Sequence, residues 1–284
     1  MSTLLACTDG SAYAPSVYDH AAWAAQRLSA SIHVLHLVDP HHETATSANY
    51  SGAIGLGAKT ALMEELVQLE ATKARLAQAR GRALLDVARE HLARAGITAV
   101  VADQKYGSLA DSIETYDAAA DLVVIGKRGE NTSLDFKHLG SNLERVVRTC
   151  QHPVLVASRA FKPIRRVLLA YDAGPSANRA VEYLAATPLL KECAIHLLSV
   201  GSGGARLSGG RTAAEAKLRA AGYEVKSELL PGHPIEVISK TVKEDGIDLL
   251  VMGAYGHMHI RHLLIGSTTA TLLRTCPIPA FLFR

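Results

Sequence analysis

The chain has 284 residues, of which 48% are hydrophobic and 20% charged, and its formal net charge is +3. This length allows two domains of ordinary size, and the composition is that of a folded globular protein. The small net charge and the lack of a basic block interleaved with aromatic residues argue against a nucleic-acid partner. No apolar run approaches the length of a membrane span, and the four cysteines form no paired motif. We therefore expect reduced thiols and a cytoplasmic location.

The first half of the chain alternates short apolar runs with helical patterns. Strands are expected at residues 4–8, 32–38, 98–102, 121–125 and 153–157. Helical spacing covers residues 12–28 and a long charged segment at 60–95, in which Gly81 is a candidate point for a break. Further helices are expected after Gly107 and from Gly140 to Cys150.

The second half repeats this order, with strands expected at residues 166–171, 195–200, 225–230, 249–252 and 278–283. The segment Asp121-Leu-Val-Val-Ile-Gly126 matches Asp248-Leu-Leu-Val-Met-Gly253, and Arg148-Thr-Cys150 matches Arg274-Thr-Cys276, which indicates a duplication. The first half is about 36 residues longer, and the excess lies between its second and third strands. Strands that alternate with helices indicate a parallel sheet covered on both faces. The predicted fold is α/β, with two tandem Rossmann-like or flavodoxin-like domains at 1–160 and 163–284, each a five-stranded, mostly parallel sheet flanked by helices.

A glycine turn follows the fourth strand of the second half. Gly253-Ala-Tyr-Gly256 comes directly after the apolar run 249–252, and Gly266-Ser267 opens the next helical segment. Glycines let a backbone approach a ligand closely. The N–H groups at a helix start, with hydroxyls beside them, suit an anion such as phosphate.

With these residues together, the chain resembles a tandem universal stress protein over nearly all of both halves. Nucleotide-binding members of that family carry Gly-x2-Gly-x9-Gly-Ser/Thr, and Gly253, Gly256, Gly266 and Ser267 fit that spacing. The family's acidic residue at the end of the first strand corresponds to Asp9 and Asp172, and its hydrophobic residue at the end of the second strand to Val38 and Val200. The resemblance implies a stress-response protein that binds ATP or a related adenine nucleotide, with Mg²⁺ as a candidate counterion for the phosphates.

The resemblance also implies where the nucleotide binds. In the second half, the residues are Ala170, Tyr171, Asp172, Val200, Met252, Gly253, Gly256, His257, Gly266, Ser267 and Thr268. A second site in the first half would comprise Thr8, Asp9, Val38, Gly126, Lys127, Arg128, Gly129, Gly140, Ser141 and Asn142. The first half has one residue too many before its third glycine, so we expect the second half to be the main site. The first site is then either vacant or specific for another ligand. Lys127 and Arg128 there either attract an anion or are solvated loop charges.

Other interpretations remain open at this point. Asp9 and Asp172 are also at positions where a carboxylate caps the next helix. No catalytic motif is present, so the prediction is slow hydrolysis of ATP or none. The histidines near the glycine turn match no structural zinc spacing, and we assign no metal site. The alternative function is an interaction scaffold, or a sensor of a lipid or metal, which the irregular first site and the long extra helix favour. The resemblance further implies an intrachain pseudo-dimer that joins the strands at 153–157 and 278–283, with a homodimer of chains as a further possibility.

Overall fold

A computed structural model describes residues 2–38, 56–107, 112–113, 115–116, 119–129, 141–254 and 266–284, with no description of the side chains of 56–62 and 141. The first half contains β1 (Thr3–Thr8), α1 (Ala14–Leu28), β2 (Ser31–Val38), α3 (Leu56–Arg94), β3 (Val100–Tyr106), β4 (Leu122–Gly126), α5 (Ser141–Thr149) and β5 (Val154–Ala157). The second half contains β6 (Arg166–Ala170), α6 (Pro175–Ala186), β7 (Ala194–Val200), α7 (Ala205–Ala220), β8 (Glu224–Leu230), α8 (Pro234–Glu244), β9 (Leu249–Gly253), α9 (Ser267–Thr275) and β10 (Ala280–Phe283). Each predicted strand is present.

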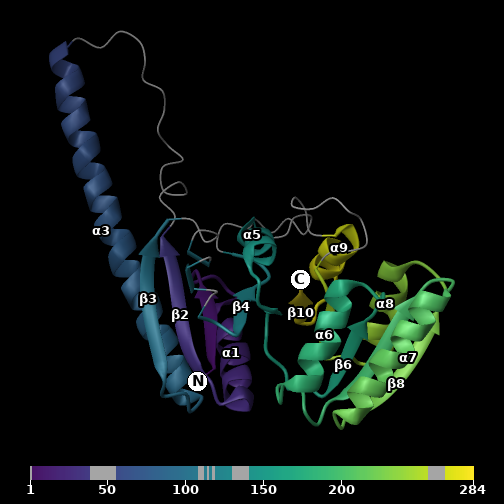
Figure 1. Ribbon diagram of the computed structural model, residues 1–284. Helices are drawn as coiled ribbons and strands as arrows, with labels where there is room; N and C mark the ends of the chain where they lie inside the picture. Colours follow the sequence, from purple (N-terminus) through teal and green to yellow (C-terminus); the bar gives the residue numbers. More distant parts are fainter. Residues whose placement is uncertain are drawn as a thin grey trace.

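The described strands form one sheet in the order β3-β2-β1-β4-β5-β10-β9-β6-β7-β8. Within each half the strands run parallel, and the α/β fold prediction is confirmed. The two halves lie side by side (Figure 1) and are joined where β5 pairs antiparallel with β10, with Leu155 opposite Phe281. This pairing confirms the expected intrachain contact, and it protects two strand edges that would otherwise be open to other chains.

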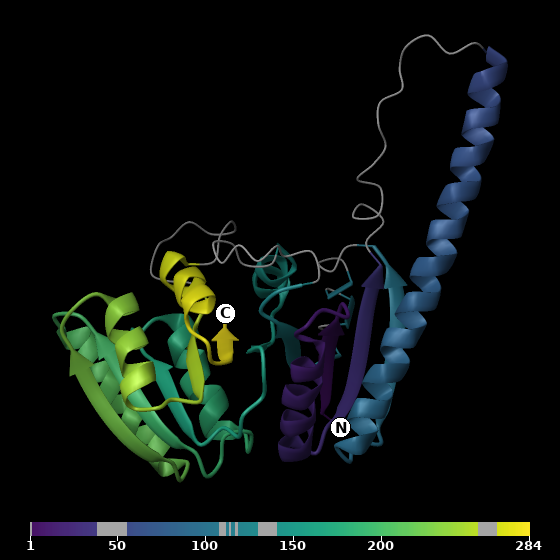
Figure 2. The same ribbon diagram turned by 180° about the vertical axis from the view of Figure 1, so that it is seen from behind.

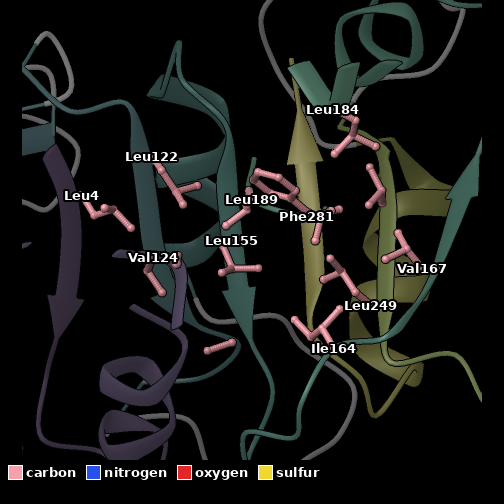
Figure 3. Packing of buried hydrophobic residues seen from close by; sticks show 14 of the residues in the cluster. Leu4, Leu122, Val124, Leu155, Ile164, Val167, Leu184, Leu189, Leu249 and Phe281 are labelled. Carbon is pink, nitrogen blue, oxygen red and sulfur yellow. The ribbon is translucent and has the colours of Figure 1, made fainter. Parts of the chain in front are cut away.

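The apolar core is continuous across this join. Leu155 and Phe281 are fully buried, and their side chains lie on neighbouring strands at the centre of Figure 3. They belong to one cluster that also contains Leu4 and Val124 of the first half and Leu249 of the second. A second cluster contains buried residues of α5, α8 and α9, which cover the other face of the sheet. The two halves therefore share a core, and we expect them to unfold together.

Helix α3 runs unbroken through Gly81, so the candidate break there does not occur. A Cβ at Gly81 would lie 2.5 Å from the side-chain amide of Gln104 on β3, so the amide packs directly against the helix backbone at this glycine. The C-terminal part of α3 buries Leu85, Ala88 and Leu92 against the domain, whereas its N-terminal part projects beyond the sheet (Figures 1 and 2). No helix among the described residues has both the length and the apolar character needed to cross a membrane.

Candidate functional site

The two predicted site aspartates occupy equivalent turns at the carboxyl edge of the sheet. Asp9 follows β1, and its Oδ1 accepts a hydrogen bond of 2.9 Å from the Ser11 N–H. Asp172 follows β6, and its Oδ1 accepts one of 2.8 Å from the Gly174 N–H. Each carboxylate therefore shapes its turn through one oxygen. The helices that follow have no side-chain cap, so the helix-capping alternative is wrong for both residues.

The turn of the second half contains a strained residue where the first half has glycine. Gly10 has φ +74°, a conformation that glycine adopts readily. The equivalent residue Ala173 has φ +58°, which is rare for a residue with a Cβ. The guanidinium of Arg206, in the first turn of α7, donates a hydrogen bond of 3.0 Å to the Ala173 carbonyl. Arg206 thus supports the Asp172 turn, a role that the sequence pattern did not indicate.

In the first half, a cavity opens beside the Asp9 turn. Its walls come from β1, β2, β4, α1 and α5 and from the turns beside them, and they contain both apolar and polar residues. The lining residues are Cys7, Thr8, Asp9, Ser11, Tyr13, Ala14, Val17, Leu35, Leu37, Gly107, Ile125, Gly126, Arg128, Gly129, Asn142 and Leu143. Six of the residues predicted for the first site, namely Thr8, Asp9, Gly126, Arg128, Gly129 and Asn142, are thereby brought together around one space.

Gly129 is fixed by its contact with Asp9. A Cβ on Gly129 would lie 2.7 Å from Asp9 Oδ2, closer than a real Cβ contact allows. The loop after β4 therefore contacts the carboxylate after β1 through backbone alone. The Ser11 hydroxyl reinforces the same contact by donating to the Arg128 carbonyl at 3.4 Å.

Lys127 does not face this cavity, which corrects the expectation that its charge attracts an anion there. Its ammonium donates hydrogen bonds to the carbonyls of Cys276 (2.5 Å) and Ile278 (2.7 Å), both in the second half. The side chain is buried, so it is not a solvated loop charge either. Burial lowers its pKa from 10.5 to about 8. Lys127 is thus a bridge between the halves, and Arg128 is the cation that lines the cavity.

Val38 was also expected to line the first site, but the cavity contacts Leu35 and Leu37 of β2 instead. Successive side chains of a strand point to opposite faces of the sheet, so Leu35 and Leu37 share the face that lines the cavity and Val38 lies on the other face. The carbonyl of Val38 accepts a hydrogen bond of 3.1 Å from the Gly107 N–H. Alternation along the strand was the signal that could have identified Leu35 and Leu37.

In the second half, the predicted apolar residues gather at the carboxyl edge. Ala170, Val200 and Met252 end or nearly end β6, β7 and β9, and all three pack in one cluster. Tyr171 instead points toward α6, where its hydroxyl donates a hydrogen bond of 2.6 Å to the side-chain oxygen of Asn178. Its N–H donates to the Leu198 carbonyl, and its own carbonyl accepts from the Ser199 hydroxyl at 2.8 Å. Tyr171 therefore holds β6 against β7 and α6.

The two ends of the glycine turn in the second half meet in space. The Gly266 N–H donates to the Ala254 carbonyl at 3.2 Å, and the Thr269 hydroxyl donates to the Gly253 carbonyl at 3.0 Å. These bonds bring the start of α9 against the end of β9. The Gly266 N–H is used in this way, and the first bond within the helix comes from the Ala270 N–H. The amides of Ser267, Thr268 and Thr269 are therefore the ones that α9 presents at its uncapped N-terminus.

Several predicted residues are outside the described part of the chain. Gly256 and His257 fall between Ala254 and Gly266, and Gly140 precedes α5. Ser141 begins α5, but its side chain is not described. The prediction that these residues contact a ligand stays a prediction.

The sequence and the fold match known proteins. The model of the universal stress protein family matches residues 1–158 and 203–284. Universal stress protein Slr1230 of Synechocystis sp. is 40% identical over 287 residues, which is 100% of both chains. The chain belongs to the universal stress protein family.

Solved structures agree with this membership at the level of the fold. A universal stress protein from Archaeoglobus fulgidus matches with a TM-score of 0.69 and 21% identity, over 99% of this chain and 98% of the other. The Pseudomonas aeruginosa protein PA1789, of unknown function, matches with a TM-score of 0.62 and 14% identity, over 100% and 92% of the two chains.

Proposed function

We propose that this universal stress protein binds an adenine nucleotide such as ATP, chiefly in its second half, and acts as a regulatory protein in the cytoplasm. The observation that carries the proposal is the meeting of the two ends of the glycine turn, where Gly266 bonds to Ala254 and Thr269 to Gly253. This contact places the N-terminus of α9 at the carboxyl edge of the sheet, where open α/β sheets bind their ligands. The positive end of a helix dipole favours phosphate.

The proposed roles follow the chemistry of the residues. Ala170, Val200 and Met252 offer an apolar surface to the base. The Asp172 carboxylate accepts hydrogen bonds from ribose hydroxyls, which are strong because the acceptor is charged. The amides and hydroxyls of Ser267 and Thr268 bind the phosphates, with Gly256 and His257 close by in the chain. A divalent ion such as Mg²⁺ would neutralise phosphate charge when present.

We expect slow hydrolysis at most. Phosphoryl transfer needs a group that orients the attacking water or accepts its proton, in addition to a phosphate-binding loop. No motif in the sequence supplies such a group.

Calorimetry on nucleotide-free protein tests the proposal, with ATP, ADP and AMP as ligands. The combined variant Gly256→Val/Ser267→Ala removes the close backbone approach and one hydroxyl of the second site. We expect it to lose ATP binding while its melting temperature stays near that of the wild type. Equal ATP affinity in variant and wild type would show that the second half is not the main site.

A second candidate function is favoured by the cavity beside Asp9. Its described lining combines apolar side chains such as Leu35, Leu37 and Ile125 with the cation Arg128, which suits a small ring-shaped ligand with one negative charge as well as a nucleotide. Native mass spectrometry of the purified protein distinguishes the candidates. A bound adenine nucleotide supports the first, whereas a non-nucleotide ligand together with no measurable nucleotide binding supports a sensor or scaffold.

A further inference from the structure

Helix α3 carries an apolar surface that nothing in the described chain covers. Among the described residues, most of the exposed large hydrophobic side chains are on this helix, namely Met63, Leu66, Val67, Leu69, Leu76 and Val87. Leu69 is 50% exposed and Leu76 is 65% exposed, although both are leucines within a regular helix. Contiguous exposed apolar residues of this kind mark an interaction surface.

The spacing of these residues is that of a helix that pairs with another helix. Leu66, Leu69, Lys73 and Leu76 follow one another at intervals of three and four residues, which places them on one stripe. Lys73 is only partly exposed, and its methylene chain continues the apolar stripe between the leucines.

Charge along the helix identifies the partner. Residues 63–72 contain Glu64, Glu65 and Glu70 and no basic residue, and all three are exposed. Residues 73–82 contain only basic charges, from Lys73, Arg75, Arg80 and Arg82. At 3.6 residues per turn, Glu65, Glu70, Lys73 and Arg80 lie on or beside the leucine stripe, whereas Glu64, Arg75 and Arg82 lie on the opposite side of the helix. A second copy of α3 in the antiparallel direction brings Glu65 and Glu70 of each helix toward Arg80 and Lys73 of the other. A parallel copy brings like charges together, which is unfavourable.

We propose that two chains associate through residues 63–82 of α3 as an antiparallel helix pair. The segment is about 30 Å long at 1.5 Å per residue. Its N-terminal part projects from the domain, so a second helix can reach it (Figures 1 and 2), while Ala77 is buried, Gly81 lies against β3 and Leu76 stays exposed. The edges of β5 and β10 are paired with each other inside the chain, so this pairing does not compete with α3 for the second copy.

Analytical ultracentrifugation across a wide range of concentrations tests the proposal. The wild type is expected to approach twice the chain mass of 30.2 kDa at high concentration. Leu69→Glu/Leu76→Glu is expected to stay monomeric, with unchanged helix content by circular dichroism. Val101→Glu is the matched control, because Val101 is 56% exposed but lies on β3, and it is expected to dimerise like the wild type.

Charge reversal tests the antiparallel direction. Glu65→Lys/Glu70→Lys, and separately Lys73→Glu/Arg80→Glu, are each expected to weaken the dimer roughly tenfold at low salt, because the charge pairs beside the leucine stripe change from attraction to repulsion. The two sets combined in one chain are expected to restore most of the affinity. A helix pair in the parallel direction gives no such restoration.

Three results would overturn the proposal. The first is a wild-type chain that stays monomeric at every concentration. The second is a leucine variant that dimerises as well as the wild type. The third is a monomeric wild type that sediments with anionic lipid vesicles, which would assign the surface to a membrane.

Discussion

Lys127 makes the stability of this protein depend on pH in a way that can be calculated. Its ammonium is buried at the contact between the two halves and donates to the carbonyls of Cys276 and Ile278. Burial lowers its pKa in the folded state from 10.5 to about 8. Between these two values the unfolded chain holds a proton that the folded chain has released. The free energy of unfolding contributed by this group therefore rises with pH from about 8 to about 10.5.

The size of the effect follows from the shift in pKa. At about 1.4 kcal/mol per unit, the change over the whole interval is roughly 3 kcal/mol. Lys127→Met keeps the length of the side chain and removes the titration. The difference in unfolding free energy, wild type minus variant, is expected to be constant below about pH 8. Between about pH 8 and pH 10.5 the difference is expected to increase, so that the wild type becomes more stable relative to the variant.

Denaturant unfolding at a series of pH values from neutral to alkaline measures this difference. Lys162→Met is the control, because Lys162 is exposed in the linker between the halves and its removal leaves the buried contact between them unchanged. A Lys127→Met difference that is flat across the interval, or that moves in favour of the variant, would refute the reasoning. It would mean that the folded protein keeps this lysine protonated.

Three further predictions concern the turns and the chemistry of the site. Gly129→Ala is expected to lower stability by about 1 kcal/mol or less in thermal unfolding, because its Cβ would lie 2.7 Å from Asp9 Oδ2 and the end of that side chain can turn away; a loss of several kcal/mol would contradict this. Gly209→Ala in α7 should raise stability by up to about 1 kcal/mol, because its Cβ meets nothing and alanine favours the helix. Gly210→Ala should stabilise the protein less than Gly209→Ala, or destabilise it, because its Cβ would lie 3.0 Å from the Tyr171 hydroxyl. A Gly210→Ala variant that is more stable than the Gly209→Ala variant would be evidence against this packing. Phosphate release from ATP should stay close to the rate of a buffer control, and rapid turnover would contradict the assignment as a regulatory protein.

The sequence was sufficient to predict the architecture because the signals for it are local and repeated. Apolar runs of strand length recur in the same order in both halves, and matched segments such as 121–126 and 248–253 identify the duplication. The pairing of β5 with β10 was expected from the family resemblance, and the structure confirms it.

The features that sequence reasoning missed depend on contacts between distant residues. Lys127 reaches carbonyls roughly 150 positions away, so no local pattern reveals its role as a bridge. The contact between Gly81 of α3 and the side chain of Gln104 likewise joins residues of two different elements. The positions of Leu35 and Leu37, in contrast, could have been predicted, because side chains alternate along β2 and these two share the face that lines the cavity. Val38 was predicted only because it is the last residue of the strand.

The central claim is that the second half is the main nucleotide site, and matched substitutions of the two equivalent aspartates test it most directly. Asparagine keeps the side-chain oxygen that each turn uses but removes the charge offered to the ribose. Calorimetric titration with ATP is expected to show roughly tenfold weaker binding for Asp172→Asn, as for the loss of one hydrogen bond to a charged group. Asp9→Asn is expected to bind ATP as the wild type does. Weakened binding in Asp9→Asn alone, or equal affinity in both variants, would contradict the claim.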